Sequence, residues 1–391
     1  MTIPAAPLGI LGDGQLALML GEAAFSQGFD FLAFGDNKDS SFARAFPDRF
    51  IQGNPKSTHE LIDFARKCGT LILENEFFES AALESIENES HTPIIPSPMS
   101  YRNFETKLVQ RAFYDRLGLK GPKWAQAKET LALTSSQVEK DFGYPLVLKA
   151  SRGGYDGYGV RVVKNSSDLP QALRELNHTT HNPVLIEEMV LIRKEFAQGA
   201  LFDGKGGAIL LPLVETVQKN GICELVLSRS TLPSGEFALV RSKIERALLA
   251  LSKSSLVGLF NFEFFYTESN EVLINEGAPR PHNSQHLSID SCPISQFELL
   301  VRFAVTRALP AVASPIEAKP AVMINLLGKS NGTQYALGLP TLPLDIEAYP
   351  KLYLKKESRV GRKMGHLNLV DPNGTTDLVS LGFSVQKEYT L

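Results

Sequence analysis

Cysteine is scarce in this 391-residue sequence, and the few cysteines lie far apart. Cys68, Cys223 and Cys292 form no CxxC pair, and their odd number does not suit a framework of disulfides. A zinc site built on cysteine pairs is excluded for the same reason. We therefore expect three small buried hydrophobic side chains in a reducing compartment, and hence a cytoplasmic location.

Long apolar runs and blocks of like charge are also missing. No stretch approaches the roughly 18 consecutive apolar residues of a membrane helix, and the first residues show no secretory signal pattern. Lysine and arginine total 40 against 43 acidic residues, which gives a net charge of −3 without a basic arm. This distribution argues against nucleic acid and membrane surfaces as partners.

The chain is too long for one compact core, because single cores rarely grow past about 250–300 residues. Residues 8–102 alternate apolar runs with helical patterns, which predicts a Rossmann-like parallel sheet in a domain of residues 1–102. The prolines of residues 92–98 predict a linker. Residues 103–310 predict a mixed second domain, and residues 311–391 a small β lobe short of helix. The expected fold class is therefore α/β and α+β.

Residues 12–17 read Gly-Asp-Gly-Gln-Leu-Ala between an expected strand and an expected helix, and Asp36 ends the next strand. This arrangement fits a dinucleotide fingerprint, in which glycines admit a pyrophosphate and the acid binds a ribose hydroxyl. Any tight strand–glycine–helix turn gives the same letters, so a plain turn is the simpler interpretation. A nicotinamide-dependent oxidoreductase is the alternative, although it leaves the features that follow unexplained.

A second glycine-rich segment, residues 153–159, lies between two strand-like runs, the first of which contains Lys149. Such a hairpin can fold over a triphosphate, because backbone N–H groups and a fixed cation then meet the phosphates. It is not a Walker A loop, because GKS or GKT is missing. A hairpin loop without a ligand is the alternative.

Residues 260–277 predict a β-hairpin that carries opposed glutamates. A two-residue turn at 269–270 would place Glu268 opposite Glu271, and Glu263 opposite Glu276. Directly opposed carboxylates lie about 5 Å apart and repel, so a cation is expected between them, and oxygen ligands suit Mg²⁺. Neutralising one glutamate should relieve this repulsion in the metal-free protein. An exposed pair on a wet sheet face is the alternative.

Side chains that suit an oxyanion follow this hairpin and recur near the C-terminus. Arg280, His282 and Asn283 come directly after it and could hold a small oxyanion. A cluster of five cations near the C-terminus comprises Lys355, Lys356, Arg359, Arg362 and Lys363. A solvated charge run is the simpler interpretation of this cluster, and a phosphate clamp is the sharper one.

Together these motifs resemble those of the N5-carboxyaminoimidazole ribonucleotide synthetases of the ATP-grasp superfamily. The resemblance extends from Gly9 to His366 and rests most on residues 275–284 (Asn-Glu-Gly-Ala-Pro-Arg-Pro-His-Asn-Ser) and 361–366 (Gly-Arg-Lys-Met-Gly-His). It implies an ATP-grasp architecture with an N-terminal Rossmann-like pre-ATP-grasp domain, a central ATP-grasp domain and a C-terminal β-rich lobe.

The resemblance also implies roles for individual residues. The ATP phosphates would meet Lys107 and Lys149 under the loop of Gly153, Gly154, Tyr155, Asp156, Gly157, Tyr158 and Gly159. The rest of the nucleotide site would comprise Glu187, Glu188, Met189, Val190, Glu195, Gln218, Asn275 and Glu276. Mg²⁺ would bind Glu263 and Glu276, and the catalytic set would be Arg280, His282, Asn283 and Tyr155. The ribonucleotide would meet Gln15, Leu16, Glu74 and Glu76 at its imidazole, and Lys355 and Arg362 at its 5′-phosphate.

The implied reaction is phosphoryl transfer from ATP to bicarbonate, after which carboxyphosphate carboxylates the 5-amino group of aminoimidazole ribonucleotide. A homodimer is expected from the family alone. Departures from the family pattern at Phe77, Tyr158, Val160, Gln218 and Gln285 leave open a relative that acts on another acid or amine, such as formate and glycinamide ribonucleotide. A nucleotide-binding regulatory protein without activity is a further alternative, which the presence of every proposed ATP and Mg²⁺ residue argues against.

Overall fold

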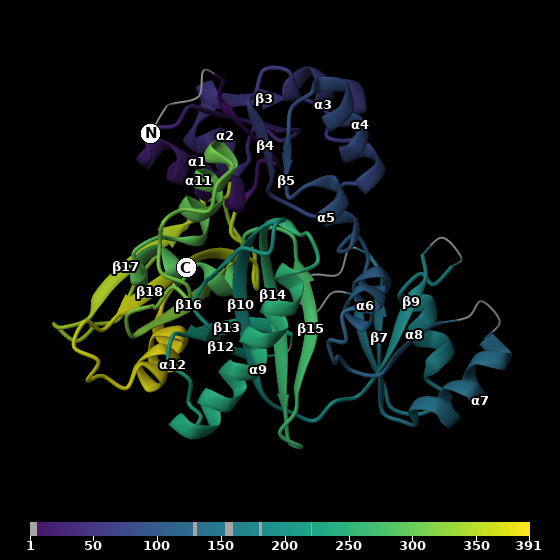
Figure 1. Cartoon of the computed structure of the whole chain (residues 1–391). Helices are drawn as coiled ribbons and strands as arrows, with labels where there is room; N and C mark the ends of the chain where they lie inside the picture. Colours follow the sequence, from purple (N-terminus) through teal and green to yellow (C-terminus); the bar gives the residue numbers. More distant parts are fainter. Residues whose placement is uncertain (1–5, 128–130, 153–158, 180–181, 220) are drawn as a thin grey trace.

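The computed structural model describes residues 6–127, 131–152, 159–179, 182–219 and 221–391. These residues form three β-sheets, which Figure 1 shows as a parallel sheet at the top, a large central sheet and a small sheet at one side. Within the described ranges, no helix is long and apolar enough to cross a membrane.

The N-terminal sheet has five parallel strands in the order β3-β2-β1-β4-β5. They are β1 (Leu8–Leu11), β2 (Phe31–Gly35), β3 (Phe50–Gln52), β4 (Thr70–Leu73) and β5 (Ile94–Ile95). The connections contain α1 (Gln15–Ser26), α2 (Ser41–Ala45), η1 (Pro47–Arg49), α3 (Thr58–Ala65) and α4 (Ser80–Ser90). Every residue of β1 and β4 is buried, as in a parallel sheet covered on both faces, so the Rossmann-like prediction is confirmed.

The prediction of a linker at residues 92–98 was wrong in its centre. Ile94 and Ile95 are fully buried and pair with Leu71 and Ile72 as the fifth strand of the parallel sheet. The prolines at 93 and 96 lie on either side of this two-residue strand and not within it, so they leave its ladder intact.

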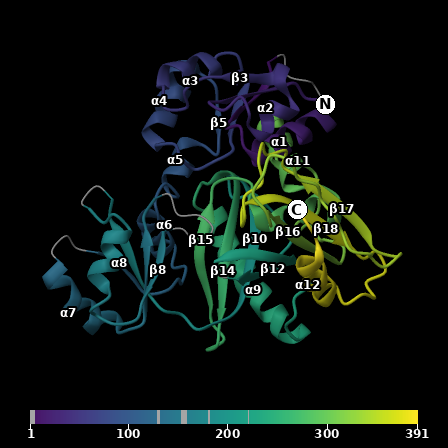
Figure 2. The ribbon, with the colours of Figure 1, turned by 180° about the vertical axis from the view of Figure 1, so that it is seen from behind.

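The small sheet is antiparallel, in the order β6-β9-β7-β8. Its strands are β6 (Trp124–Gln126), β7 (Leu146–Ala150), β8 (Val160–Val163) and β9 (Val184–Glu188), and its helices are α7 (Leu131–Phe142) and α8 (Leu169–Glu175). The apolar side of α8 packs on the buried residues of β7 and β9. Figures 1 and 2 show this unit beside the large sheet, beyond α5 (Pro98–Arg102) and α6 (Lys107–Arg116).

The large sheet has nine antiparallel strands in the order β15-β14-β10-β12-β13-β16-β18-β17, with β11 paired to β10. These are β10 (Ile192–Asp203), β11 (Ala208–Leu210), β12 (Val214–Lys219), β13 (Ile222–Leu227), β14 (Val257–Thr267), β15 (Val272–Ala278), β16 (Ala321–Leu327), β17 (Glu347–Leu352) and β18 (Lys363–Val370). The long helix α9 (Ser234–Ser252) packs on the face that carries Phe260, Phe262 and Phe264. Glu263, between these phenylalanines along β14, therefore lies on the opposite face.

The C-terminal region differs from the expected small β lobe in two respects. Its strands β16 to β18 continue the large sheet through the pairing of β13 with β16, so they do not form a sheet of their own. The region also ends in a helix, α12 (Leu378–Glu388), so the expectation of little helix was wrong at that place. Gly382 allows α12 to approach closely, because a Cβ there would lie 3.0 Å from Val322.

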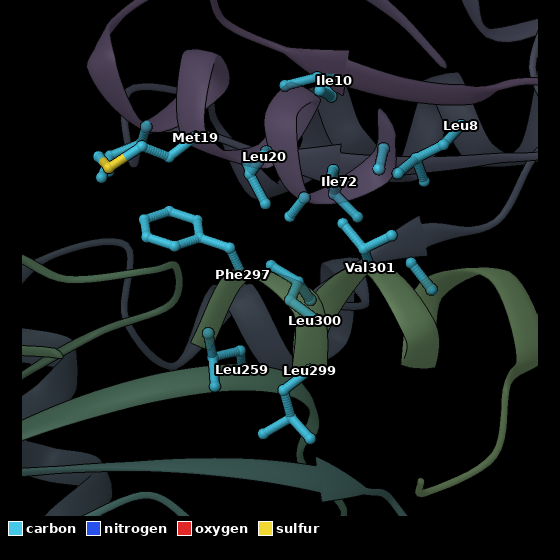
Figure 3. Close-up of a cluster of buried hydrophobic side chains, with 14 of the residues drawn as sticks. Leu8, Ile10, Met19, Leu20, Ile72, Leu259, Phe297, Leu299, Leu300 and Val301 are labelled. Atoms are coloured by element: carbon cyan, nitrogen blue, oxygen red, sulfur yellow. The ribbon is translucent and has the colours of Figure 1, made fainter. Parts of the chain in front are cut away.

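One helix, α11 (Gln296–Thr306), lies between the N-terminal sheet and the large sheet (Figure 1). Phe297, Leu300 and Val301 point from α11 towards α1 and the parallel strands, while Leu299 points towards Leu259 of β14 (Figure 3). All of these side chains are at most 2% exposed. The packing of α11 therefore joins the two sheets into one apolar core.

This core gives a prediction on stability. Leu300→Ala should lower the free energy of unfolding by about 2–5 kcal/mol, because it removes buried methyl groups and leaves a cavity between α1 and α11. Urea denaturation followed by circular dichroism would measure the change. Leu239→Ala on α9 is the control, since Leu239 is 50% exposed and its loss should change stability by less than about 0.5 kcal/mol. Equal effects of the two substitutions would contradict the assignment of this core.

Candidate active site

The hairpin of β14 and β15 places Glu263 opposite Glu276, as the sequence predicted. Near the turn, however, the register differs by one residue, because Tyr266 pairs with Val272 and Phe264 with Ile274. The predicted pairing of Glu268 with Glu271 was therefore wrong. A bulge at Asn275 restores the predicted register at the glutamate pair.

Asn275 also has a contact of its own. Its side-chain oxygen accepts a hydrogen bond from Nζ of Lys149 on β7, at 3.0 Å. The bulge thus connects the hairpin to the small sheet, at the position where the expected triphosphate site would lie.

The two opposed glutamates have different electrostatic surroundings. Burial and the charge of Glu276 raise the pKa of Glu263. The ammonium group of Lys107, which forms an ion pair with Glu276, holds the pKa of Glu276 well below its usual range. On the neighbouring strand β10, burial raises the pKa of Glu195 to about 7, with a further rise from Glu276. The repulsion expected between the opposed carboxylates thus raises the pKa of Glu263, while that of Glu276 stays low.

The carboxylate pair fits Mg²⁺ better than it fits a metal held by protein alone. In the described part of the chain, no group of three or more His, Cys, Asp or Glu side chains could hold a metal ion. Mg²⁺ is usually bound by one or two carboxylates, with substrate phosphates and water completing its shell. Glu263 and Glu276 have the right chemistry for that arrangement.

A buried ion network adjoins this pair. Glu187 on β9 is 2% exposed and contacts two cations, Nζ of Lys149 at 2.7 Å and the guanidinium group of Arg111 on α6. Arg111 also donates to the backbone oxygen of Ile274 at 2.7 Å. A cavity of about 10 Å³ lies among Lys107, Arg111, Lys149 and Glu276. Cations from α6 and β7 therefore meet at one point beside the glutamate pair.

Sequence reasoning assigned Lys107 and Lys149 to this place but missed Arg111. Arg111 lies one helical turn after Lys107 on α6, and that spacing was the available signal. The side chain of Glu187, which the family resemblance assigned to the nucleotide site, belongs to this ion network.

The segment after β15 brings the expected oxyanion residues next to the same pair. Arg280 forms a two-point ion pair with Glu76 of the N-terminal domain, which holds the pKa of Glu76 low although burial opposes this. Nε2 of His282 lies 3.8 Å from Oε1 of Glu263. Burial, with the charges of Arg280 and Lys363, lowers the pKa of His282 to about 4, so this imidazole is neutral at pH 7. Asn283 follows it at the start of η2 (Asn283–Gln285).

The glycine turn at residues 12–17 does not leave room for a dinucleotide. The carboxylate of Glu74 occupies it, since a Cβ on Gly12 or on Gly14 would lie 2.5 Å from a carboxylate oxygen of Glu74. Burial raises the pKa of Glu74, and the backbone N–H of Leu16 in the first turn of α1 lowers it. An internal carboxylate therefore takes the place of the pyrophosphate, and the plain-turn interpretation holds.

The C-terminal cations differ in the groups that they contact. Lys356 forms an ion pair with Asp39 at 2.7 Å, and Arg362 donates to the backbone oxygen of Glu357 at 3.0 Å. Lys363, at the start of β18, instead lowers the pKa of both Glu263 and His282 through its charge. Lys355 and Arg362, and not Lys363, were the residues predicted to bind the ribonucleotide. The ammonium group of Lys355 lies 5.7 Å from the centre of the Tyr353 ring.

The remaining expected residues are spread around this site. Glu188 accepts a hydrogen bond from the backbone N–H of Lys123 at 2.7 Å, and Met189 is 43% exposed where β9 ends. Gln218 lies on β12, opposite Cys223 of β13. Gly153, Gly154, Tyr155, Asp156, Gly157 and Tyr158 lie outside the described residues, and Gly159, which follows them, has a φ of 82°.

Three family models match the chain in the order that the sequence motifs suggested. They are the ribonucleotide synthetase preATP-grasp domain at residues 5–102, the ATP-grasp domain at residues 112–297 and the phosphoribosylaminoimidazole carboxylase C-terminal domain at residues 321–376.

Individual relatives agree with this order. An N5-carboxyaminoimidazole ribonucleotide synthase of Synechococcus elongatus is 32% identical over 94% of this chain and 90% of its own length. A phosphoribosylaminoimidazole carboxylase of Saccharomyces cerevisiae is 29% identical, and this chain spans 63% of its length. Among solved structures, an N5-carboxyaminoimidazole synthase of Aspergillus clavatus, in complex with ADP and 5-aminoimidazole ribonucleotide, is 25% identical with a TM-score of 0.81 and covers 98% of each chain.

A second solved structure extends the likeness to a bacterial enzyme. The N5-carboxyaminoimidazole ribonucleotide synthetase of Thermotoga maritima is 29% identical, with a TM-score of 0.79 over 98% of this chain and 99% of that one. On this identity and coverage, the chain belongs to the N5-carboxyaminoimidazole ribonucleotide synthase family of ATP-grasp ligases, which form a carbon–nitrogen bond.

Proposed function

We propose that this protein uses ATP, Mg²⁺ and bicarbonate to carboxylate the 5-amino group of 5-aminoimidazole ribonucleotide, releasing ADP and phosphate. The observation that carries the proposal is the meeting of three features at one point. Two opposed, partly buried carboxylates, the cations Lys107 and Lys149, and the Arg280–His282 segment all lie at the end of β15.

The cations would bind the triphosphate. Lys107 and Lys149 approach the glutamate pair from α6 and β7, so they would neutralise charge on the phosphoryl oxygens from two sides. Glu263 and Glu276 would hold Mg²⁺, which supplies further neutralisation of phosphate charge when bound. Arg111 would keep Glu187 ionised beside Lys149 and thereby fix the ammonium group of that lysine.

The segment after β15 would bind bicarbonate and its carboxyphosphate product. The two-point contact with Glu76 fixes the orientation of the guanidinium group of Arg280, whose remaining N–H donors could bind an oxyanion. The imidazole of His282 is neutral, so it can donate or accept a hydrogen bond without adding charge. Asn283 and the nearby Lys363 would complete the oxyanion site, with Tyr155 expected from the family.

The amine would enter from the side of the N-terminal domain. Gln15 and Leu16 begin α1, and Glu74 and Glu76 follow β4, so the carboxyl end of the parallel sheet faces Arg280. Lys355 and Arg362 would bind the 5′-phosphate. A cytoplasmic homodimer is part of the proposal on family grounds. Another acid or amine is the second candidate, because Phe77, Tyr158 and Gln218 depart from the family pattern.

A direct assay tests this function. ADP release in the presence of ATP, Mg²⁺ and bicarbonate should rise when 5-aminoimidazole ribonucleotide is added, and ¹⁴C from bicarbonate should appear in the product. Formate with glycinamide ribonucleotide is the matched comparison. Stimulation by formate and not by bicarbonate would replace the proposal with the second candidate.

The two metal carboxylates should respond differently to neutralisation. Glu263→Gln and Glu276→Gln should each lower turnover by at least about 100-fold, because both remove a charge that faces Mg²⁺. Without Mg²⁺, Glu263→Gln should keep or raise the melting temperature, since Glu263 is the repelled member of the pair. Glu276→Gln should lower it, because the partly buried ammonium group of Lys107 loses its partner.

The result expected for Glu276→Gln corrects the prediction that neutralising Glu276 would relieve repulsion, because the ion pair of Glu276 with Lys107 is not visible in the sequence. Differential scanning fluorimetry with and without Mg²⁺ measures the melting temperatures. Near-normal turnover of either variant would show that the metal assignment is wrong.

Arg362 gives a prediction on substrate binding. Arg362→Ala should raise the KM for the ribonucleotide at least about tenfold with little change for ATP, because loss of a charge-assisted phosphate contact costs about 2–5 kcal/mol. Steady-state kinetics with each substrate varied in turn measures this. A solvated charge run would instead change both constants by less than about twofold. Lys363→Ala is the comparison, and its position predicts a larger effect on bicarbonate than on the ribonucleotide.

A further inference from the structure

A buried glutamine, Gln296, holds the backbone of the proposed oxyanion residue His282. Gln296 is the first residue of α11 and has no exposed surface. Its Oε1 accepts from the backbone N–H of His282 at 2.9 Å, and its Nε2 donates to the backbone oxygen of the same residue at 2.9 Å. The same Nε2 lies 2.9 Å from Nδ1 of His286, so its second N–H can donate to that ring nitrogen. One amide group thus makes three contacts with the segment that follows β15.

These contacts fix the orientation of the amide and the tautomer of His286. A backbone N–H can only donate and a backbone oxygen can only accept, so Oε1 and Nε2 of Gln296 cannot be exchanged. Nδ1 of His286 must then accept, and its proton is on Nε2. Burial lowers the pKa of His286 well below its ordinary value, which agrees with this neutral form.

Asn283, the residue after His282, is held in a similar way by a side chain of the C-terminal region. Asn325 on β16 has no exposed surface, and its amide pairs reciprocally with that of Asn283 at 2.9 and 2.7 Å. Nδ2 of Asn325 also donates to the backbone oxygen of Cys223 at 2.9 Å. Two buried amides, from α11 and from β16, therefore fix consecutive residues of the site.

We propose that Gln296 and Asn325 are positioning residues for the oxyanion site, because their buried amides hold the backbone of His282 and the side chain of Asn283 in place. The proposal rests on the proposed function, in which these two residues bind bicarbonate and carboxyphosphate. A buried backbone group that loses its partner costs about 1–3 kcal/mol, so the segment keeps this arrangement before any ligand arrives. Donors that are fixed in advance need no reorganisation during the reaction.

The position of Gln296 also connects this site to the N-terminal domain. Phe297 and Leu300, on the same helix, pack against α1 (Figure 3). The helix that packs between the N-terminal domain and the large sheet therefore also carries the amide that positions His282.

The first experiment compares Gln296→Glu with Gln296→Met. Both should raise the KM for bicarbonate at least about tenfold and leave the KM for ATP within about twofold, because the lost contacts belong to the oxyanion segment. Only Gln296→Glu should add a dependence on pH. Its carboxyl group can donate to His282 or His286 when protonated, whereas the carboxylate repels the backbone oxygen of His282.

Relative to the unmodified protein, kcat/KM for bicarbonate of Gln296→Glu should therefore fall at least about tenfold as pH rises from about 6 to about 9. The same ratio for Gln296→Met should be constant. Other titratable or charged groups also face His286 and could titrate in the same range. They are His366 and Lys363 on β18, Arg280 and His282 in the segment after β15, and Tyr353. They are common to all the variants, so their effects cancel in the ratio.

The second experiment uses Asn325→Leu, which should also raise the KM for bicarbonate at least about tenfold at unchanged KM for ATP. Gln198→Met is the control, because Gln198 is equally buried but lies opposite Phe262, on the face of the sheet that packs against α9, and donates to the backbone oxygen of Leu211. It should leave the KM for bicarbonate within about twofold.

The outcomes separate the two proposals. If ADP release by the unmodified protein does not depend on bicarbonate, the proposed function fails. If it does depend on bicarbonate, an unchanged KM in Gln296→Met and Asn325→Leu, or equal pH profiles for Gln296→Glu and Gln296→Met, overturns the positioning role. A smaller folded fraction lowers the apparent kcat but leaves KM unchanged, so it does not imitate the expected rise in the KM for bicarbonate.

Discussion

The structure around the active site depends on two carboxylates that lie opposite each other, partly buried, on neighbouring strands. Glu263 and Glu276 would repel if they were alone, so cations must approach them. Lys107 comes from α6, and Lys363 from the C-terminal region adds its charge. The elements that supply these cations lie far apart in the chain, and the need to neutralise one carboxylate pair brings them together.

The same need explains why the ion network extends into the small sheet. Lys149 contacts both Glu187 and Asn275, so a cation of β7 is held between its own sheet and the hairpin of the large sheet. Arg111 on α6 contacts the other carboxylate oxygen of Glu187 and also donates to the backbone of β15. Three elements are thus coupled through buried charges at the point where we place the ATP phosphates.

The N-terminal domain is coupled to the site by a second set of contacts. Apolar side chains of α11 pack on α1, and the ion pair of Arg280 with Glu76 crosses between the domains beside the proposed oxyanion site. The C-terminal region adds Lys351 with Glu22 and Lys356 with Asp39. The first two contacts join the N-terminal domain to the domain proposed to bind ATP, and the last two join it to the C-terminal region proposed to bind the 5′-phosphate.

The sequence by itself determined the local features of this protein. Alternating apolar residues predicted the strands of the hairpin, the glycine pattern predicted a tight turn before α1, and the motifs predicted the family. Only the tertiary structure decided that Glu74 fills that turn, that Lys107 neutralises one glutamate of the pair, and that Gln296 and Asn325 hold the oxyanion segment. The register is instructive, since the predicted turn was wrong and the bulge at Asn275 still brought Glu263 opposite Glu276. The physical reason is that periodicity reports which face a residue occupies, whereas the partner of a buried charge or amide comes from a distant part of the chain that packing alone brings near.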